Sequence, residues 1–261
     1  MRLTFVTQND PIYVLPFFEE FFQGYSNEFS VDHILVSRVM GKRSRVKLLR
    51  ELVALYTLPG LVRLGLRLLA LKCLGALPAG SRPGRFSSIK HLSSTYGVSY
   101  KEIGNPNAPD VIAGIRAAQP DVLISVASPY IFKETLLSVP RKGCINIHHA
   151  PLPRYKGMMP TFWQMLHGER SVGITVHYMA GKLDEGAALL QDRLEIKPGE
   201  SLDSLIRRSK RYGAHCIARV LRHIVAGTQR PIVLDQTQGS YFTFPNREQM
   251  REFHRRGFRA I

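Results

Sequence analysis

The chain has 261 residues, of which 44% are hydrophobic and 21% are charged, so its composition is that of a globular protein and not of a disordered or fibrous one. Its 36 lysines and arginines against 20 aspartates and glutamates give a net charge of +16, which indicates an anionic partner without identifying it. The length suits one large domain or two small ones.

The three cysteines, Cys73, Cys144 and Cys216, are far apart in the sequence and form no Cys-x-x-Cys pair. The spacing indicates neither a disulfide framework nor a zinc ribbon, and a reducing cytoplasm is the expected compartment. The N-terminus reaches Gln8 too soon to contain the apolar core of a signal peptide, and no run of 18 uncharged residues occurs further on. We therefore expect neither export by that route nor a membrane span.

Short apolar runs predict strands at Leu3–Val6, Val31–Val39, Val98–Ile103, Asp121–Ala127 and Gly143–His148. Between these strands the pattern favours helices at Tyr13–Phe22, from Asn107 to Ala118, and at Pro129–Val139, with Asn107 and Asp110 as candidate N-caps of the second helix. The last two strands are apolar on both faces, as in a parallel sheet covered by helices. This alternation predicts an α/β fold with a Rossmann-like, doubly wound, mostly parallel sheet, which binds ligands at the carboxyl ends of its strands.

After a loop rich in proline and glycine, the pattern predicts a short helix, two strands of a hairpin and a long helix, at Thr161–His167, Val172–Met179, Ala188–Ile196 and Ser201–Val225. Ser201 is the expected N-cap of the long helix. We therefore expect one catalytic-size domain over residues 1–226, ending in a C-terminal helix, and a short basic tail over residues 227–261.

A helical basic insertion interrupts the α/β pattern from about residue 41 to residue 97. Up to residue 90 it has eleven basic residues against one acidic residue, so a net +10 of the total +16 falls there. On a helical wheel Arg43, Lys47 and Arg50 form a stripe opposite a row of apolar side chains. Most of the net charge of the chain is therefore local.

The next part of the insertion, Leu61–Leu77, is apolar nearly all round apart from Arg63, Arg67 and Lys72. Such a pair of helices can pack on the domain, pack on a second copy of the chain in a homodimer, or lie on an anionic membrane surface through residues 42–77. Aromatic side chains for base stacking are sparse in the insertion, which disfavours a nucleic acid as the partner. Peripheral contact with the inner face of the membrane is thus one expected location.

Two polar side chains stand where the strand Gly143–His148 runs into a loop. Asn146 and His148 are two residues apart, so they point to the same face of the strand. An amide and an imidazole side by side can polarise a carbonyl group and transfer a proton. His149 points to the other face, and we expect it to have a structural role.

A second candidate segment, Gly173–Gly186, contains Gly-Ile-Thr-Val-His and then Leu-Asp-Glu-Gly. Asp184 follows a glycine-containing loop, where a carboxylate can orient a histidine and stabilise its charge. His177 lies on a predicted strand and is expected to be a packed, hydrogen-bonded residue. No spacing typical of a metal site, such as His-Glu-x-x-His, occurs, so no metal is expected.

Together these motifs resemble the family of formyltransferases that use 10-formyltetrahydrofolate. The resemblance covers about residues 98–226 and rests on Asn-x-His at 146–148, Leu-Pro-x-x-x-Gly at 152–157, the helix start Pro160–Trp163, and the Gly-x-Thr-Val-His strand that leads into Leu-Asp-x-Gly. It implies that an acceptor amine attacks the formyl carbon of 10-formyltetrahydrofolate, which is the formyl donor.

The resemblance also implies the roles of individual residues. Asn146 and protonated His148 stabilise the oxyanion, and Asp184 supports His148 and proton transfer to the leaving folate nitrogen. The implied folate cleft is lined, largely through backbone, by Ser128, Tyr130, Ile131, Met179, Ala180, Gly181, Lys182 and Leu183. The chain departs from many relatives in reading His148-His-Ala-Pro-Leu-Pro153 and in having Ala180-Gly-Lys182 where an acidic residue is common.

The acceptor is inferred by comparing branches of the family. Methionyl-tRNA enzymes carry a C-terminal barrel, whereas only residues 226–261 follow Val225, and glycinamide-ribonucleotide enzymes have a Gly-Asn-Gly-Ser loop where this chain has Thr7–Pro11. The expected acceptor is a primary amine, most plausibly an amino sugar carried on a nucleotide or lipid phosphate. The alternatives are a 10-formyltetrahydrofolate hydrolase, a methionyl-tRNA formyltransferase-like enzyme without the barrel, and a non-catalytic relative.

Overall fold

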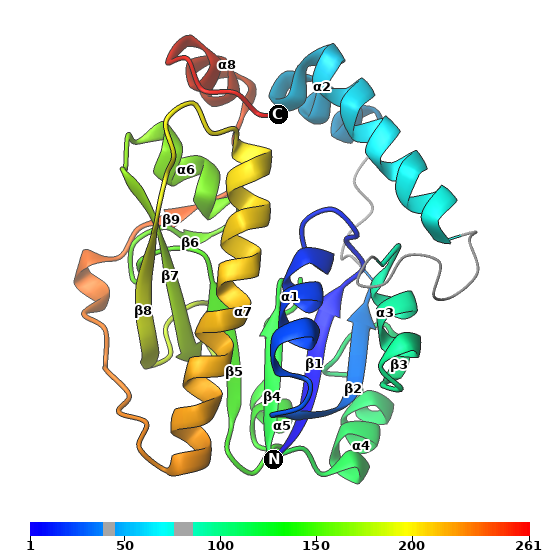
Figure 1. The fold of residues 1–261 in the computed structure, drawn as a ribbon. Helices are drawn as coiled ribbons and strands as arrows, with labels where there is room; N and C mark the ends of the chain where they lie inside the picture. The colour runs from blue at the N-terminus through cyan, green and yellow to red at the C-terminus, as the bar shows by residue number, and fades with distance from the viewer. Residues whose placement is uncertain (39–44, 76–85) are drawn as a thin grey trace.

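The computed structural model describes residues 1–38, 45–75 and 86–261, with the side chains of the second segment described from Val53 onward. Its centre is a seven-stranded sheet formed by β1 (Arg2–Gln8), β2 (Ser30–Ser37), β3 (Ser99–Ile103), β4 (Val122–Val126), β5 (Cys144–His148), β7 (Ser171–Tyr178) and β8 (Ala188–Glu195). The strand order is β3-β2-β1-β4-β5-β7-β8 (Figure 1). The first five strands pair in parallel, and β7 pairs antiparallel with both β5 and β8. The predicted Rossmann-like sheet and its terminal hairpin are therefore confirmed.

The helices of the described residues are α1 (Leu15–Tyr25), α2 (Arg45–Gly75), α3 (Ile89–Thr95), α4 (Pro109–Ala118), α5 (Glu134–Leu137), α6 (Pro160–Leu166), α7 (Leu202–Ala226) and α8 (Arg247–Arg255). Helices cover both faces of the sheet, whereas α2 and α8 lie at one end of the molecule (Figure 1). Apolar side chains of α1, α3 and α7 share one buried cluster with the sheet, and those of α4 and α5 share another. Ser201 caps α7 as predicted, because its side chain accepts a hydrogen bond from the N–H of Ser204. The central strands β1, β4 and β5 are thus buried on both faces, as in a parallel sheet covered by helices, whereas the edge strands β3 and β8 also carry exposed polar side chains.

Four phenylalanine side chains fix α1 on β1. Phe17, Phe18 and Phe21 surround Phe5, with ring centroids 5.2 to 6.1 Å from it, and all four rings are fully buried. Edge-to-face packing of this kind adds to the burial of apolar area. The loop between β1 and α1 is thereby held at the carboxyl edge of the sheet.

Two predicted helices on the other face differ from expectation. α4 begins at Pro109, and neither Asn107 nor Asp110 caps it. The Asn107 side chain instead donates to the carbonyl of Ile131 at 2.9 Å and accepts from the N–H of Lys133 at 2.8 Å. These bonds hold the loop after β4 in a non-helical path, so α5 has one turn and does not extend over the predicted 129–139.

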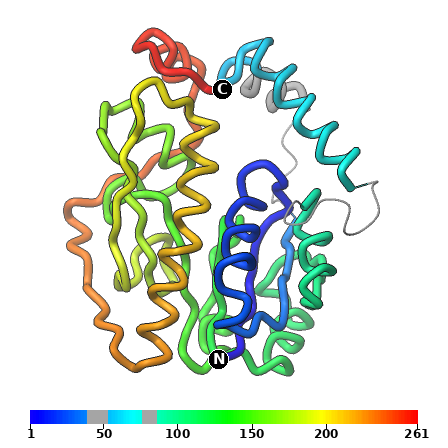
Figure 2. Tube along the Cα trace, in the orientation of Figure 1, coloured from blue at the N-terminus to red at the C-terminus, as the bar shows by residue number. Residues whose placement is uncertain are grey.

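Residues 227–261, expected as a short tail, are folded onto the domain and run back toward α2 (Figure 2). A short helical turn (Gln236–Gln238) precedes β9 (Tyr241–Phe242), which pairs with β6 (Lys156–Gly157). On α8, Phe253 stacks on Phe162 of α6 with ring centroids 4.9 Å apart. The end of the chain thus belongs to the same hydrophobic cluster as the loop and helix that follow β5.

The insertion is helical as predicted, but α2 consists of two helical segments joined at Thr57, whose backbone is non-helical (φ 59°, ψ 168°). Pro59 has no N–H to donate to the carbonyl of Leu55, so the usual helical bond is missing there. That carbonyl accepts a hydrogen bond at 3.0 Å from Nε2 of His254 on α8 instead. The break in α2 is therefore also its attachment to α8.

Part of the predicted insertion is not described. Arg43 lies outside the described residues, and the side chains of Lys47 and Arg50 lie outside the described side chains, so the predicted basic stripe has no structural counterpart here. Among the described residues, the segment Val53–Gly75 is long and apolar enough to cross a membrane by length and composition alone. Only 17% of its apolar 18-residue stretch is buried inside the protein.

Candidate active site

β5 carries the two polar side chains that the sequence singled out. Ile145 and Ile147 belong to the cluster beneath α7, and Cys144 belongs to the cluster on the opposite face. Because side chains alternate along a strand, Asn146 and His148 point to the same face as Cys144. The predicted shared face is therefore present.

His148 is buried, with 8% of the residue exposed, and both its ring nitrogens face oxygen atoms. Nε2 lies 2.8 Å from the carbonyl oxygen of Tyr155, which can only accept, so Nε2 carries a hydrogen. Nδ1 faces Oδ2 of Asp184 at 3.6 Å, which is beyond a direct hydrogen bond. The backbone thus fixes the ring, and Nδ1 is the nitrogen left to exchange a proton beside a carboxylate.

Asp184 reaches His148 because the loop after β7 folds back on itself. Its backbone has a φ of 55°, and its side chain accepts the N–H of Gly157 at 3.2 Å. Gly186 permits this path, since a Cβ there would lie 1.7 Å from the carbonyl oxygen of Tyr178. Asp184 is 6% exposed, and the backbone N–H of Gly157 holds its carboxylate in place.

His177 is packed and hydrogen-bonded, as the sequence predicts, and its partner is one of these residues. Its Nδ1 donates to the carbonyl oxygen of Tyr178 at 2.8 Å, so Nε2 accepts from the Asn146 amide at 3.1 Å. Burial lowers the pKa of His177, although the Tyr178 carbonyl and Asp184 oppose that shift, and the neutral ring fits the acceptor role. One amide hydrogen of Asn146 is therefore donated to His177, and this bond fixes the direction of the second amide hydrogen. The register that places Asn146 opposite His177 is the signal that sequence reasoning missed.

The predicted folate-contacting residues lie in two loops next to this group. Residues 179–183 lead directly to Asp184, and Met179 donates its N–H to the carbonyl of Cys144 at 2.8 Å. Residues 128–131 follow β4, the neighbour of β5 in the sheet. Two of the predicted residues, Ile131 and Leu183, present apolar side chains that are 51% and 40% exposed. Their contact with folate remains a prediction.

On the other face, His149 is buried and lies against α7, where a Cβ on Gly213 would come within 3.1 Å of its ring. Among the described residues neither ring nitrogen of His149 has a hydrogen-bond partner. Burial lowers its pKa well below 6.5, with smaller contributions from Lys210 and His148. A neutral, packed ring agrees with the expected structural role.

Lys210, one turn before Gly213 on α7, is a partly buried cation close to the site. Burial lowers the pKa of Lys210 to about 8, and Asp10 in the loop after β1 opposes the shift. The charge therefore interacts both with the loop after β1 and with His149, at the carboxyl edge of the sheet.

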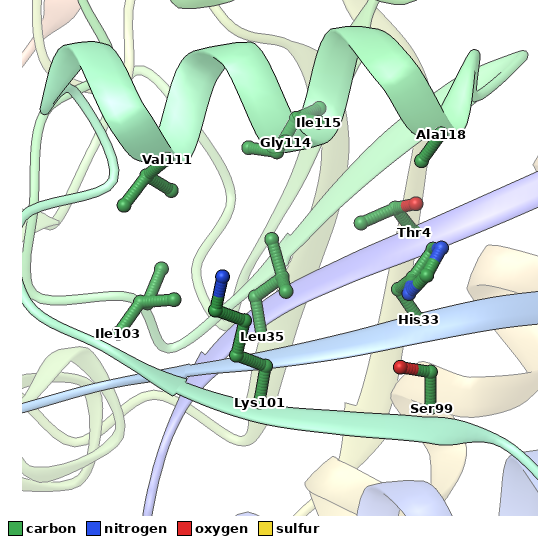
Figure 3. Close-up of a pocket in the computed structure, with 10 residues that line it drawn as sticks. All are labelled: Thr4, His33, Leu35, Ser99, Lys101, Ile103, Val111, Gly114, Ile115 and Ala118. Atoms are coloured by element: carbon green, nitrogen blue, oxygen red, sulfur yellow. The ribbon is translucent and has the colours of Figure 1, made fainter.

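A separate pocket lies beneath α4 against β1, β2 and β3 (Figure 3). His33 and Lys101 are its basic side chains, and most of the others are apolar. It contains none of the residues described above. Within the described residues, no group of three or more histidine, cysteine, aspartate or glutamate side chains is arranged to hold a metal ion.

Comparisons with known proteins identify the family of the chain. A family model described as formyl transferase matches residues 89–221, just over half of the chain. The chain therefore belongs to the formyl transferase family, whose members are enzymes. The matched residues include Asn146, His148, His177 and Asp184.

Individual relatives differ in their acceptors. The methionyl-tRNA formyltransferase of Trichlorobacter lovleyi is 34% identical over 153 residues, which are 59% of this chain and 48% of that protein. A phosphoribosylglycinamide formyltransferase from Anaplasma phagocytophilum has a TM-score of 0.60 at 14% identity, covering 94% of this chain and 98% of that one. An N-formyltransferase from Helicobacter canadensis, in complex with folinic acid and dTDP-3-aminofucose, has a TM-score of 0.59 at 15% identity, covering 96% and 78%. The chain spans about half the length of the curated relatives it matches, and the likeness to the solved structures establishes the fold.

Proposed function

We propose that this protein transfers a formyl group from 10-formyltetrahydrofolate to a primary amine. The observation that carries the proposal is the group formed by half-buried Asn146 with buried His148 and Asp184, in which His177 orients the amide and Tyr155 orients the imidazole. The site fits a folate donor, because the exposed apolar side chains of Ile131 and Leu183 lie in the two loops beside it. The Asn146 amide also keeps one hydrogen that is not donated to His177. When bound, the donor supplies an electrophilic formyl carbon.

The residues of the chain would act on that carbon as follows. The Asn146 amide hydrogen not used by His177 donates to the formyl oxygen as negative charge develops there. Protonated His148 donates from Nδ1 to the same oxygen, and the Asp184 carboxylate at 3.6 Å stabilises the imidazolium. As the amine forms its bond to carbon, Asp184 accepts the proton that the amine loses and passes a proton to the departing folate nitrogen.

For the acceptor, we propose an amino sugar carried on a nucleotide or lipid phosphate. The half-buried ammonium group of Lys210, which lies at the carboxyl edge within electrostatic range of Asp10 and His149, supports an anionic acceptor. The H. canadensis structure, which holds a dTDP-linked aminosugar, supports the same class. Sequence similarity favours a second candidate, a methionyl-tRNA acceptor, since relatives with that name are 34% identical over the matched part.

The test is tetrahydrofolate release from 10-formyltetrahydrofolate, followed by absorbance with the full chain. The acceptors are a panel of nucleotide-linked amino sugars, lipid-phosphate amino sugars and methionyl-tRNA, each against a no-acceptor control. Release that requires one amino sugar supports the proposal, and release that requires methionyl-tRNA supports the second candidate. Equal release with no amine would identify a hydrolase, and no release from any mixture would reject the proposed activity.

A further inference from the structure

The outer side of α2 carries a continuous apolar stripe. Leu58, Val62, Leu66 and Leu69 recur every three or four residues, so they share one side of the helix. They are 69%, 63%, 61% and 58% exposed in that order. Cys73, also exposed, follows Leu69 by four residues and extends the row. We call these five residues the outer stripe.

The opposite side of α2 is docked on the domain, which fixes the direction of the outer stripe. Leu61 and Leu64 pack against the hydrophobic cluster that contains α8. Arg67 donates from Nη1 to Oδ1 of Asp203 at 2.8 Å, and the Asp203 side chain is 2% exposed. A helix that spanned a bilayer would lose this ion pair, so the structure favours a helix that keeps its docked side on the protein and presents its outer side elsewhere.

We propose that the outer stripe inserts into the interfacial region of an anionic membrane, with this part of α2 lying parallel to the surface. Apolar side chains bury at the boundary between head groups and acyl chains, while exposed basic side chains beside them contact the head groups. Arg63 and Lys72 are exposed cations on this helix. The insertion contributes a net +10 to a chain of net charge +16, which attracts anionic lipid and repels a second copy of the same chain.

The position of α2 determines how membrane contact would orient the rest of the protein. Figure 1 shows α2 beside α8 at the end of the molecule where β1 and β2 finish. The hydroxyl groups of Tyr56 and Tyr13 lie 2.9 Å apart, which ties α2 to the loop after β1. Leu55 also belongs to the same cluster as Tyr155, whose carbonyl holds His148. Membrane contact would therefore turn the carboxyl edge of the sheet toward the bilayer, whichever acceptor the site takes.

The test uses the native cysteines. Cys73 is exposed and both Cys144 and Cys216 are buried, so an environment-sensitive fluorophore can label the stripe selectively. The labelled full chain is mixed with vesicles of phosphatidylcholine, with or without phosphatidylglycerol, and unlabelled protein is assayed by flotation. We expect a blue shift and flotation with the anionic vesicles, both reduced by salt.

Two double variants with the same change in net charge separate the effect of apolar insertion on vesicle binding from the effect of charge. Val62→Glu with Leu66→Glu changes the outer stripe, and Val225→Glu with Val233→Glu makes the same charge change at valines that are 59% and 88% exposed elsewhere. We expect the stripe variant to bind anionic vesicles at least about tenfold more weakly than the control variant. Equal binding by both variants would overturn the proposal, as would absence of wild-type binding at low salt. A wild-type dimer that the stripe variant converts to a monomer, without vesicle binding, would identify a second copy of the chain as the occupant.

Discussion

Replacing Asp184 by asparagine removes one charge from the site and leaves its shape. The Gly157 N–H keeps an acceptor, because the asparagine oxygen can occupy the position of Oδ2. The lost interaction is that of the carboxylate with an imidazolium 3.6 Å away, and both groups are buried. At an effective dielectric constant of about 20 that attraction is worth about 5 kcal/mol, part of which is realised only in the transition state. We expect kcat to fall about a thousandfold.

The assay is the initial rate of tetrahydrofolate release under saturating acceptor, with donor binding measured separately by fluorescence. We expect donor affinity to change by no more than several fold, because the predicted contacts of residues 179–183 are largely made by backbone. Glu185→Gln is the matched control: it removes the neighbouring carboxylate, which pairs with Lys156 and Lys182 and not with His148. A kcat for Asp184→Asn within tenfold of the control would refute the assignment of Asp184.

Three further outcomes follow from the described contacts. Lys210→Met should raise KM for an anionic acceptor about tenfold with little change in kcat. In the wild type, loss of the Lys210 charge should add a fall in kcat/KM centred at about pH 8, and that fall should be absent from the pH profile of Lys210→Arg. Gly186→Ala should lower the free energy of unfolding in urea by about 1–3 kcal/mol, because the added Cβ would meet the Tyr178 carbonyl; an unchanged urea midpoint would contradict this. Burial raises the pKa of Asp203, but its bonds to arginines, including Arg67, leave the pKa lowered overall. That contribution to stability is present above about pH 4 and is lost as the pH falls through the lowered pKa, so the melting temperature of Asp203→Asn should be less sensitive to acid than that of the wild type.

The sequence was informative wherever one local pattern determines the outcome. Alternation and turn residues located the strands of the sheet, and the two-residue spacing of Asn146 and His148 placed both on one face. Asp184 was predicted from the family motif and not from the periodicity of the chain, because its approach to His148 depends on a loop that folds back at Gly186. Such a loop path depends on contacts between distant segments, which no local pattern encodes.

Side-chain partners that depend on register or on competition between distant segments were missed for the same reason, although His177 is packed and hydrogen-bonded as predicted. His177 alternates like any core residue, and only the antiparallel pairing of β5 with β7 puts it opposite Asn146. Asn107 is of a residue type that commonly caps helices, yet its side chain hydrogen-bonds to the loop after β4. These hydrogen bonds also limit α5 to one turn. In both cases the side chain had an alternative partner far away in the sequence.

The chemistry and the surroundings of the site come from different parts of the chain. Asn146, His148, His177 and Asp184 all lie within the residues that match the family, 89–221. The described part of α2 and all of α8 lie outside that match, and they bind each other through the carbonyl of Leu55. Their shared cluster reaches the loop that holds His148. Segments beyond the family match are therefore placed to influence what approaches the carboxyl edge, while the proposed catalytic group itself can remain unchanged.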